Sequence, residues 1–217
     1  MDTTNYLLKF KVGSVACGLS TDKSDLDHKL LVDPKLYTDD IDIDDIAHFT
    51  KDGIDYFVGR LDGYVDPTRM CGIVTVPEFD PSNMIDSKSP RLAAYWREYG
   101  PEIMDAYPLV TYGTAIVQAE KCIGYHRYDM AVNFIGRVAC RMETGRMLTA
   151  YKLDDHWREL YHKAKTGEID ESDVVKLLNG IRADTYRKYY ESLPVNTEII
   201  EEFTGVIRDT LVKTEVM

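Results

Sequence analysis

Residues 13–27, GSVACGLSTDKSDLD, place a Gly-Ser turn about ten residues ahead of Asp25 and Asp27, two aspartates separated by one residue. In an extended strand successive side chains point to opposite faces, so these two carboxylates would project from the same face. Mg²⁺ prefers such oxygen ligands and usually takes one or two protein carboxylates, completing its shell with water and substrate phosphate. The stretch therefore predicts a phosphoryl- or nucleotidyl-transfer site.

The sequence on each side supports this interpretation. Residues 6–12 (YLLKFKV) are apolar and β-prone and run directly into Gly13. Gly13 would let the backbone approach a phosphate closely, and the Ser14 hydroxyl with adjacent N–H groups would donate to phosphate oxygens. Residues 26–32 form a second apolar run that Asp33-Pro34 ends. A Ser-Asp-x-Asp string alone is also typical of a solvated turn or a helix cap, which remains the alternative.

These residues resemble the DNA polymerase β-like nucleotidyltransferases, whose signature reads G-S-x-A-x-G followed by S-D-x-D. The matching positions, in order and spacing, are Gly13, Ser14, Ala16, Gly18, Ser24, Asp25 and Asp27. The chain is similar to the stand-alone, RlaP-like branch of bacteria and phages, and the likeness extends to residues 161–168 (YHKAKTGE) and 192–198 (SLPVNTE). The resemblance covers most of the chain.

The resemblance implies a third carboxylate on a strand beside the first two, because a second metal that activates the attacking hydroxyl needs another anionic ligand. Asp55 is the predicted residue, since it opens the β-like run 56–58 just after Gly53. Asp52 and Asp62 are the alternatives. The predicted metal ligands are therefore Asp25, Asp27 and Asp55, holding Mg²⁺ with Mn²⁺ as a substitute.

The predicted nucleotide-binding residues are Gly13, Ser14, Ser24, Lys121 and Arg137. The first two would hold the β- and γ-phosphates, and Ser24 belongs to the signature. Lys121 and Arg137 come from the C-terminal half and would contact the base. No histidine is needed for this chemistry, and His28, which follows Asp27, should point to the opposite face of its strand.

Composition limits the remaining choices. With 217 residues, 44% hydrophobic and 29% charged, the chain reads as an ordinary globular protein of one or two domains. No apolar run approaches the length of a membrane span and the N-terminus carries no signal-peptide pattern, so we expect a cytoplasmic protein. The four cysteines show no C-x-x-C spacing, which favours free thiols over zinc or disulfides.

The formal net charge of −11 disfavours long polyanions as partners unless a local basic patch is present. The predicted patch is residues 115–146, where Arg137 and Arg141 are four apart and share one face of a helix. The acceptor of the transfer stays open at this point: an RNA end, a protein or a small hydroxylated molecule. The resemblance favours RNA ends, whereas the charge favours a smaller acceptor or a protein.

The chain changes character along its length. Short β-like runs at 6–12, 26–32, 54–58 and 71–76 alternate with loops that include the acidic run 39–45. From about residue 90 the pattern is helical, beginning with a helix from Pro90 that Gly100-Pro101 should stop. We therefore predict an α+β fold in which a small mixed β-sheet core with flanking helices precedes a mainly helical half.

The predicted domains are a nucleotidyltransferase catalytic domain at 1–112 and a helical domain at 113–217. The predicted function is Mg²⁺-dependent transfer of a nucleoside monophosphate from an NTP to an acceptor hydroxyl with release of pyrophosphate. The alternative is a nucleotide-binding regulatory or antitoxin-like module without useful turnover.

Overall fold

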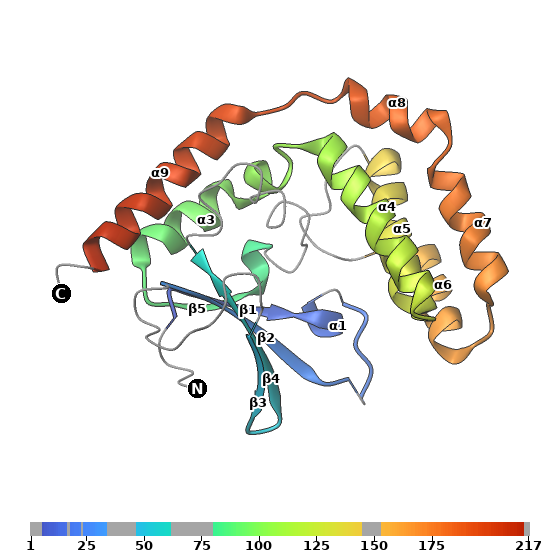
Figure 1. The fold of residues 1–217 in the computed structure, drawn as a ribbon, viewed down its shortest axis with the longest axis horizontal. Coiled ribbons are helices and arrows are strands. Elements are labelled where there is room, and N and C mark those ends of the chain that lie inside the picture. Colours follow the sequence, from blue (N-terminus) through green and yellow to red (C-terminus); the bar gives the residue numbers. More distant parts are fainter. Residues whose placement is uncertain are drawn as a thin grey trace. The chain divides into compact units, whose positions relative to one another are not determined.

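The computed structural model describes residues 6–16, 18–22, 24–33, 47–61, 80–144 and 153–214. The chain forms two compact units, one made of Met1–Ala106 with Asn196–Met217 and the other of Tyr107–Val195 (Figure 1). The predicted boundary between 112 and 113 differs from this division in two ways. The break falls before Tyr107, and the last helix belongs to the unit that contains the sheet.

The first unit is built on a mixed five-stranded sheet with the order β3-β4-β2-β1-β5. Its strands are β1 (Leu8–Val12), β2 (Leu26–Val32), β3 (Ala47–Lys51), β4 (Ile54–Arg60) and β5 (Met84–Ser87). Only β2 and β4 run parallel among these pairs; the others are antiparallel. With strands first and helices after them, the predicted α+β class is confirmed.

Alternation along β1 assigns its two faces. Leu8, Phe10 and Val12 are buried on one side, while Lys9 and Lys11 point to the other. The buried side packs against a helix, because the ring of Phe10 meets that of Trp96 edge-on at 6.3 Å. This side also carries Asp27 and is called the carboxylate face below.

Helix α3 (Pro90–Met104) packs on the carboxylate face, and α9 (Thr197–Thr214) packs on α3. Trp96 of α3 lies between the sheet and α9, with its ring 5.2 Å from that of Phe203. The backbone N–H of Asn196 donates to the carbonyl of Ala106 at 3.0 Å, so the chain leaves and re-enters this unit at neighbouring points.

The prediction that Gly100-Pro101 stops the helix from Pro90 is wrong, because α3 continues through Pro101 to Met104. The turn that follows is fully buried at Ile103, which keeps the helix going despite the missing proline N–H. Gly100 is required by packing, since a Cβ there would lie 2.7 Å from Cγ of Pro81 in the short 3₁₀ helix η4 (Pro81–Asn83).

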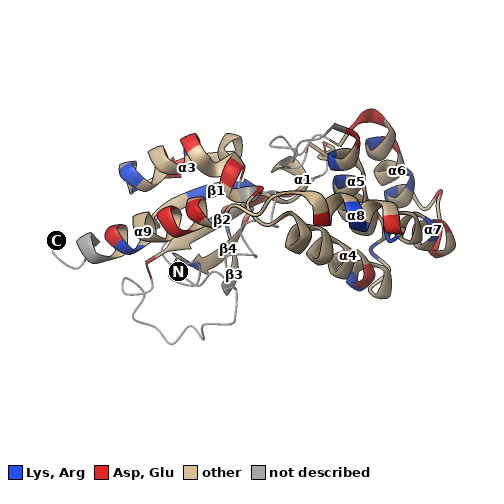
Figure 2. Ribbon diagram, turned by 90° about the horizontal axis from the view of Figure 1, so that it is seen from above, with Lys and Arg blue, Asp and Glu red and all other residues tan. Residues whose placement is uncertain are grey.

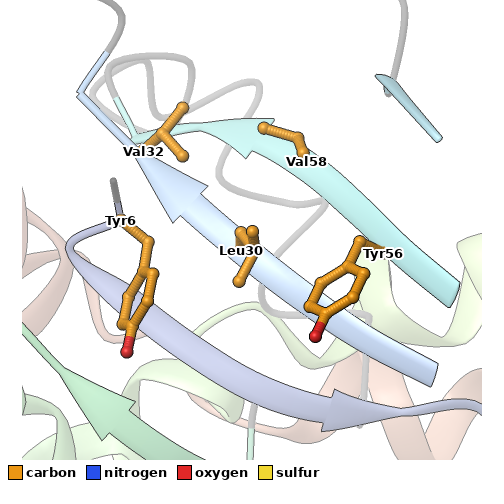
Figure 3. Close-up of a cluster of buried hydrophobic side chains, with 5 residues drawn as sticks. All are labelled: Tyr6, Leu30, Val32, Tyr56 and Val58. Atoms are coloured by element: carbon orange, nitrogen blue, oxygen red, sulfur yellow. The ribbon is translucent and has the colours of Figure 1, made fainter. Parts of the chain in front are cut away.

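The opposite face of the sheet holds a compact apolar cluster, shown in Figure 3. Its buried members are Tyr6, Leu30, Val32, Tyr56 and Val58. These side chains come from the residues before β1 and from the adjacent strands β2 and β4. The parallel β2–β4 pair is therefore apolar on this side while it carries aspartates on the other.

The second unit is helical. It contains α4 (Pro108–Gly124), α5 (Tyr128–Thr144), α6 (Asp155–Thr166), α7 (Glu171–Ile181) and α8 (Asp184–Ser192). Tyr112 and Tyr190 stack at 4.8 Å in its core, and the hydroxyl of Tyr190 donates to the carbonyl of Val138. Cys122 and Cys140 are free thiols, as expected. No described helix combines the length and apolar character that a membrane span needs.

The predicted strand at 26–32 matches β2, and the run at 54–58 extends to Arg60. The predicted strand at 71–76 and the acidic run 39–45 lie outside the described residues. Strands β3 and β5 were not predicted. For β3 the available signal was Asp52-Gly53: both residues have positive φ, 53° and 75°, as expected for the tight hairpin turn that joins β3 to β4.

Candidate active site

Strand pairing brings two of the predicted metal ligands together. In the parallel pairing of β2 with β4, Asp27 stands directly opposite Asp55. Asp25 precedes the first residue of β2, and its side chain is exposed. All three aspartates thus lie at the same end of adjacent strands.

The register of β2 with β4 distinguishes Asp55 from the other residues predicted as alternatives for the third carboxylate. Asp55 lies in β4 opposite Asp27, whereas Asp52 occupies the exposed hairpin turn with φ of 53°. Asp62 lies outside the described residues. Between the two described candidates, Asp55 and Asp52, only Asp55 occupies a strand position, and that position is opposite Asp27.

Gly13 lies directly after the last residue of β1 and is in close contact with Asp27. Val12 pairs with Asp27, and the next residue, Gly13, begins the short helix α1 (Gly13–Ala16) with φ of 69°. A Cβ at this position would lie 2.2 Å from Oδ2 of Asp27. The carboxylate occupies the space that any larger residue would need, and the left-handed backbone also favours glycine.

Ser14 and Ser24 lie on either side of the aspartates along the chain. Ser14 is in α1, half-buried, and its carbonyl accepts from the N–H of Leu19 at 2.8 Å. Ser24 closes a turn with Thr21, whose N–H donates to the Ser24 hydroxyl at 2.8 Å. The hydroxyl of Ser24 therefore closes the turn that precedes Asp25, and its binding of nucleotide stays a prediction.

The three carboxylates of the site are close enough for the charges of Asp55 and Asp25 to affect the ionisation of Asp27. The pKa of Asp27 is raised, first by burial and then by the negative charges of Asp55 and Asp25, while His48 acts in the opposite direction. Ionising all three carboxylates leaves repulsion that a nearby cation would relieve.

Two residues of β3 hold Asp55, and sequence reasoning missed both. The hydroxyl of Thr50, its cross-strand partner, donates to Oδ1 of Asp55. The Nε2 atom of His48 lies 3.6 Å from the same oxygen, and its ring stacks on Phe57 at 4.7 Å. The Asp-Gly hairpin with the alternation of residues 47–51 could have placed both side chains beside Asp55.

His28 lies on the face opposite Asp27, as predicted. It is 6% exposed and its ring meets that of Tyr56 edge-on at 5.5 Å. Burial lowers the pKa of His28 to about 4, with further lowering from the charges of Lys9 and Lys11.

The donors fit Mg²⁺ in kind, since a metal of this class needs only one or two carboxylates when phosphate and water complete its shell. Among the residues described, however, no three His, Cys, Asp or Glu side chains are grouped closely enough to hold a metal by themselves. Asp25 and Asp27 are the residues that would hold the ion, with Asp55 beside them and tied to β3.

The two remaining predicted residues belong to the second unit. Lys121 is exposed on α4. On α5, Nε of Arg137 donates to Oδ1 of the buried Asn133 at 3.1 Å, and its guanidinium lies over the ring of Phe134. Arg141 is buried, with its guanidinium 5.4 Å from the Tyr190 ring centre, so the predicted shared basic surface with Arg137 is not an exposed one. Contact of Lys121 and Arg137 with a nucleotide stays a prediction.

Comparisons with protein-family models, with curated proteins and with solved structures find no match for this chain, so its candidate function rests on the arrangement of its own residues.

Proposed function

We propose that the chain is a Mg²⁺-dependent nucleotidyltransferase that moves a nucleoside monophosphate from an NTP to an acceptor hydroxyl and releases pyrophosphate. The observation that carries the proposal is the pairing of Asp27 with Asp55 across the parallel strands β2 and β4. Asp25 lies immediately before β2, and Gly13 lies against Asp27. The resemblance of residues 13–27 to the polymerase β-like signature supports the same chemistry.

Each residue has a distinct task in this proposal. Asp25 and Asp27 would hold Mg²⁺, which neutralises phosphate charge. Gly13 leaves room for the Asp27 carboxylate, and the Ser14 hydroxyl would be a donor for phosphate oxygens. The acceptor oxygen forms a bond to the α-phosphorus, the bond to the β-phosphate oxygen breaks, and the acceptor proton is released to solvent. Catalysis of this kind depends on positioning and charge neutralisation.

A second candidate, a nucleotide-binding module without useful turnover, is favoured by one observation. Oδ1 of Asp55 is already engaged by Thr50 and faces His48, and the described residues offer no ready three-ligand metal cluster. If Asp55 serves only to fix the β3–β4 hairpin, the site would lack its second metal and would bind nucleotide without transferring it.

The test is incubation of the pure protein with each α-labelled NTP, Mg²⁺ and total RNA or cell lysate, followed by detection of labelled product. Transfer of label supports the enzyme, and saturable NTP binding without transfer supports the module. Asp27→Asn is the site variant. Asp52→Asn is its matched control, because it makes the same chemical change at the exposed hairpin turn, where Asn accepts positive φ.

A further inference from the structure

The sheet face opposite the carboxylates carries a row of cationic and aromatic side chains at the same end of the strands. Strand register places Lys11 opposite His28, His28 opposite Tyr56, and Tyr56 opposite Phe49. These four residues come from four neighbouring strands, β1, β2, β4 and β3. Lys9, two residues before Lys11, points to the same face.

One of the two lysines, Lys9, is held by this row. Nζ of Lys9 lies 5.5 Å from the ring centre of Tyr56, a cation–π contact, and the ring of Phe49 stacks on Tyr56 at 5.1 Å. Lys11 is exposed. The nearest acid in register is Asp86 of β5, opposite Lys9, and it accepts hydrogen bonds from the Tyr6 hydroxyl and the Ser87 N–H.

A buried polar atom at this place points to a ligand independently of the charges. Within the part of the chain that the structure describes, Nδ1 of His28 has no hydrogen-bond partner, although the residue is 6% exposed. A buried imidazole nitrogen without a partner is costly and calls for an explanation. Strand register places His28 between Lys11 and Tyr56, so the unpaired atom belongs to the middle residue of this row.

The chemistry of the patch selects the class of ligand. The chain as a whole has a net charge of −11, so two lysines on the same face of one strand are a local exception. Figure 2 shows basic positions on β1, basic and acidic positions together on α3, and mainly acidic ones on α9. Leu26 is exposed and Phe49 half-buried on the same face, which adds apolar surface of the kind that accompanies lysines in sites for single strands.

We propose that Lys9 and Lys11 bind phosphates of a single-stranded nucleic acid along this face, with His28 Nδ1 inside the same site. Because Val12, which pairs with Asp27, directly follows Lys11, the site begins one residue from the carboxylates on the other side of the sheet. The strand bound there would be the acceptor of the proposed transfer, and in that respect the inference rests on the proposed function.

The experiment measures binding of a fluorescein-labelled single-stranded oligonucleotide to the full chain by anisotropy over a series of salt concentrations. The site variant is Lys9→Gln/Lys11→Gln, and Lys11→Glu is a second variant at an exposed position where folding is not at risk. The control is Lys165→Gln/Lys188→Gln, which removes the same charge from exposed positions of α6 and α8.

We expect the site variant to bind about tenfold more weakly or worse at low salt. The slope of log affinity against log salt should fall by about 1.4, since each neutralised phosphate of a single strand contributes about 0.7. Lys11→Glu should weaken binding in the same direction, and the control should match the wild type. Equal loss in the site variant and the control would overturn the proposal, because overall charge would then explain the effect.

A parallel arm distinguishes the source of the phosphate and separates this inference from the proposed function. ATP affinity, measured by calorimetry with Mg²⁺, should be unchanged in Lys9→Gln/Lys11→Gln. Loss of ATP affinity in place of oligonucleotide affinity would assign the lysines to the triphosphate and overturn the proposal. Asp27→Asn should still bind the oligonucleotide, so absence of transfer alone would count against the enzyme and not against this site.

Discussion

Asp27 and His28 are consecutive residues of one strand, and their surroundings are opposite in charge. On the carboxylate face, burial and two neighbouring aspartates raise the pKa of Asp27. On the other face, burial and two neighbouring lysines lower the pKa of His28. In both cases the charged form of the side chain is disfavoured, although one group is an acid and the other a base.

The difference shows that two consecutive residues of a strand can belong to an acidic site on one face of the sheet and to a basic site on the other. Alternation sends Asp27 toward Asp55 and sends His28 toward Tyr56, and the register of β1 then adds Val12 to one side and Lys11 to the other. A cation would relieve the repulsion on the first face, whereas an anion would relieve it on the second. The predictions below test the two faces separately.

The largest effect is expected from Asp27→Asn. The change is nearly isosteric and removes a proposed ligand, so transfer should fall below about a thousandth of wild type, since even changes behind a metal ligand cost 10–100-fold. Thermal melting without Mg²⁺ should hold steady or rise, because like-charge repulsion with Asp25 and Asp55 is relieved. Retention of more than about a tenth of the activity in both Asp27→Asn and Asp25→Asn would remove the metal assignment.

Asp55→Asn sharpens the role of the third carboxylate. If Asp55 holds only the ion that activates the acceptor, transfer should drop by about 100-fold or more while NTP binding stays near wild type. Turnover and NTP affinity should be measured side by side with Asp52→Asn and Asp62→Asn, which should change little. Normal turnover in Asp55→Asn would limit this residue to its contacts with Thr50 and the hairpin.

Gly13→Ala and Gly13→Val probe the contact between the β1 turn and Asp27. The left-handed backbone costs a non-glycine residue about 1–2 kcal/mol, and the added Cβ must displace the Asp27 carboxylate, 2.2 Å away. We expect both variants to melt lower and to lose affinity for a non-hydrolysable NTP analogue, with Val worse than Ala. Unchanged affinity in Gly13→Val would make the turn purely structural.

Much of the carboxylate face could be predicted because its residues are local in sequence. Gly13, Asp25 and Asp27 are read from one motif, and period-2 alternation then separates Asp27 from His28. The sequence does not separate Asp55 from Asp52 and Asp62, because no local pattern tells which strands are neighbours in the sheet. The parallel β2–β4 pairing supplied that fact.

The parts that sequence reasoning missed depend on long-range packing. His48 and Thr50 reach Asp55 only because β3 pairs with β4 in a hairpin at the edge of the sheet, joined by the Asp52-Gly53 turn. In the last helix Ile199, Ile200, Phe203 and Ile207 recur at helical spacing and form a buried face. Such a pattern does not tell which element the buried face packs against. Phe203 packs on Trp96 of the sheet unit and not on the helical unit.

The last expected effect is confined to low pH and concerns the lysine-bearing face, where stability should respond to pH differently from the acidic face. The pKa of His28 is about 4 in the folded protein against 6.5 for the free side chain, so the unfolded chain binds a proton more readily between these values. The contribution of neutral His28 to the free energy of unfolding is therefore fully present above about pH 6.5, and it is lost as pH falls toward 4. Protonation of Asp27, whose pKa is raised, acts in the opposite direction.

His28→Phe isolates this contribution, because it keeps a ring against Tyr56 and removes the titrating group. Chemical denaturation of wild type and variant at a series of pH values should give parallel curves above pH 6.5. Below it the wild type should lose up to about 3 kcal/mol more than the variant, at about 1.4 kcal/mol per pKa unit. Parallel curves down to pH 4 would show that His28 accepts a proton without penalty, and that the lysines do not crowd it as the geometry indicates.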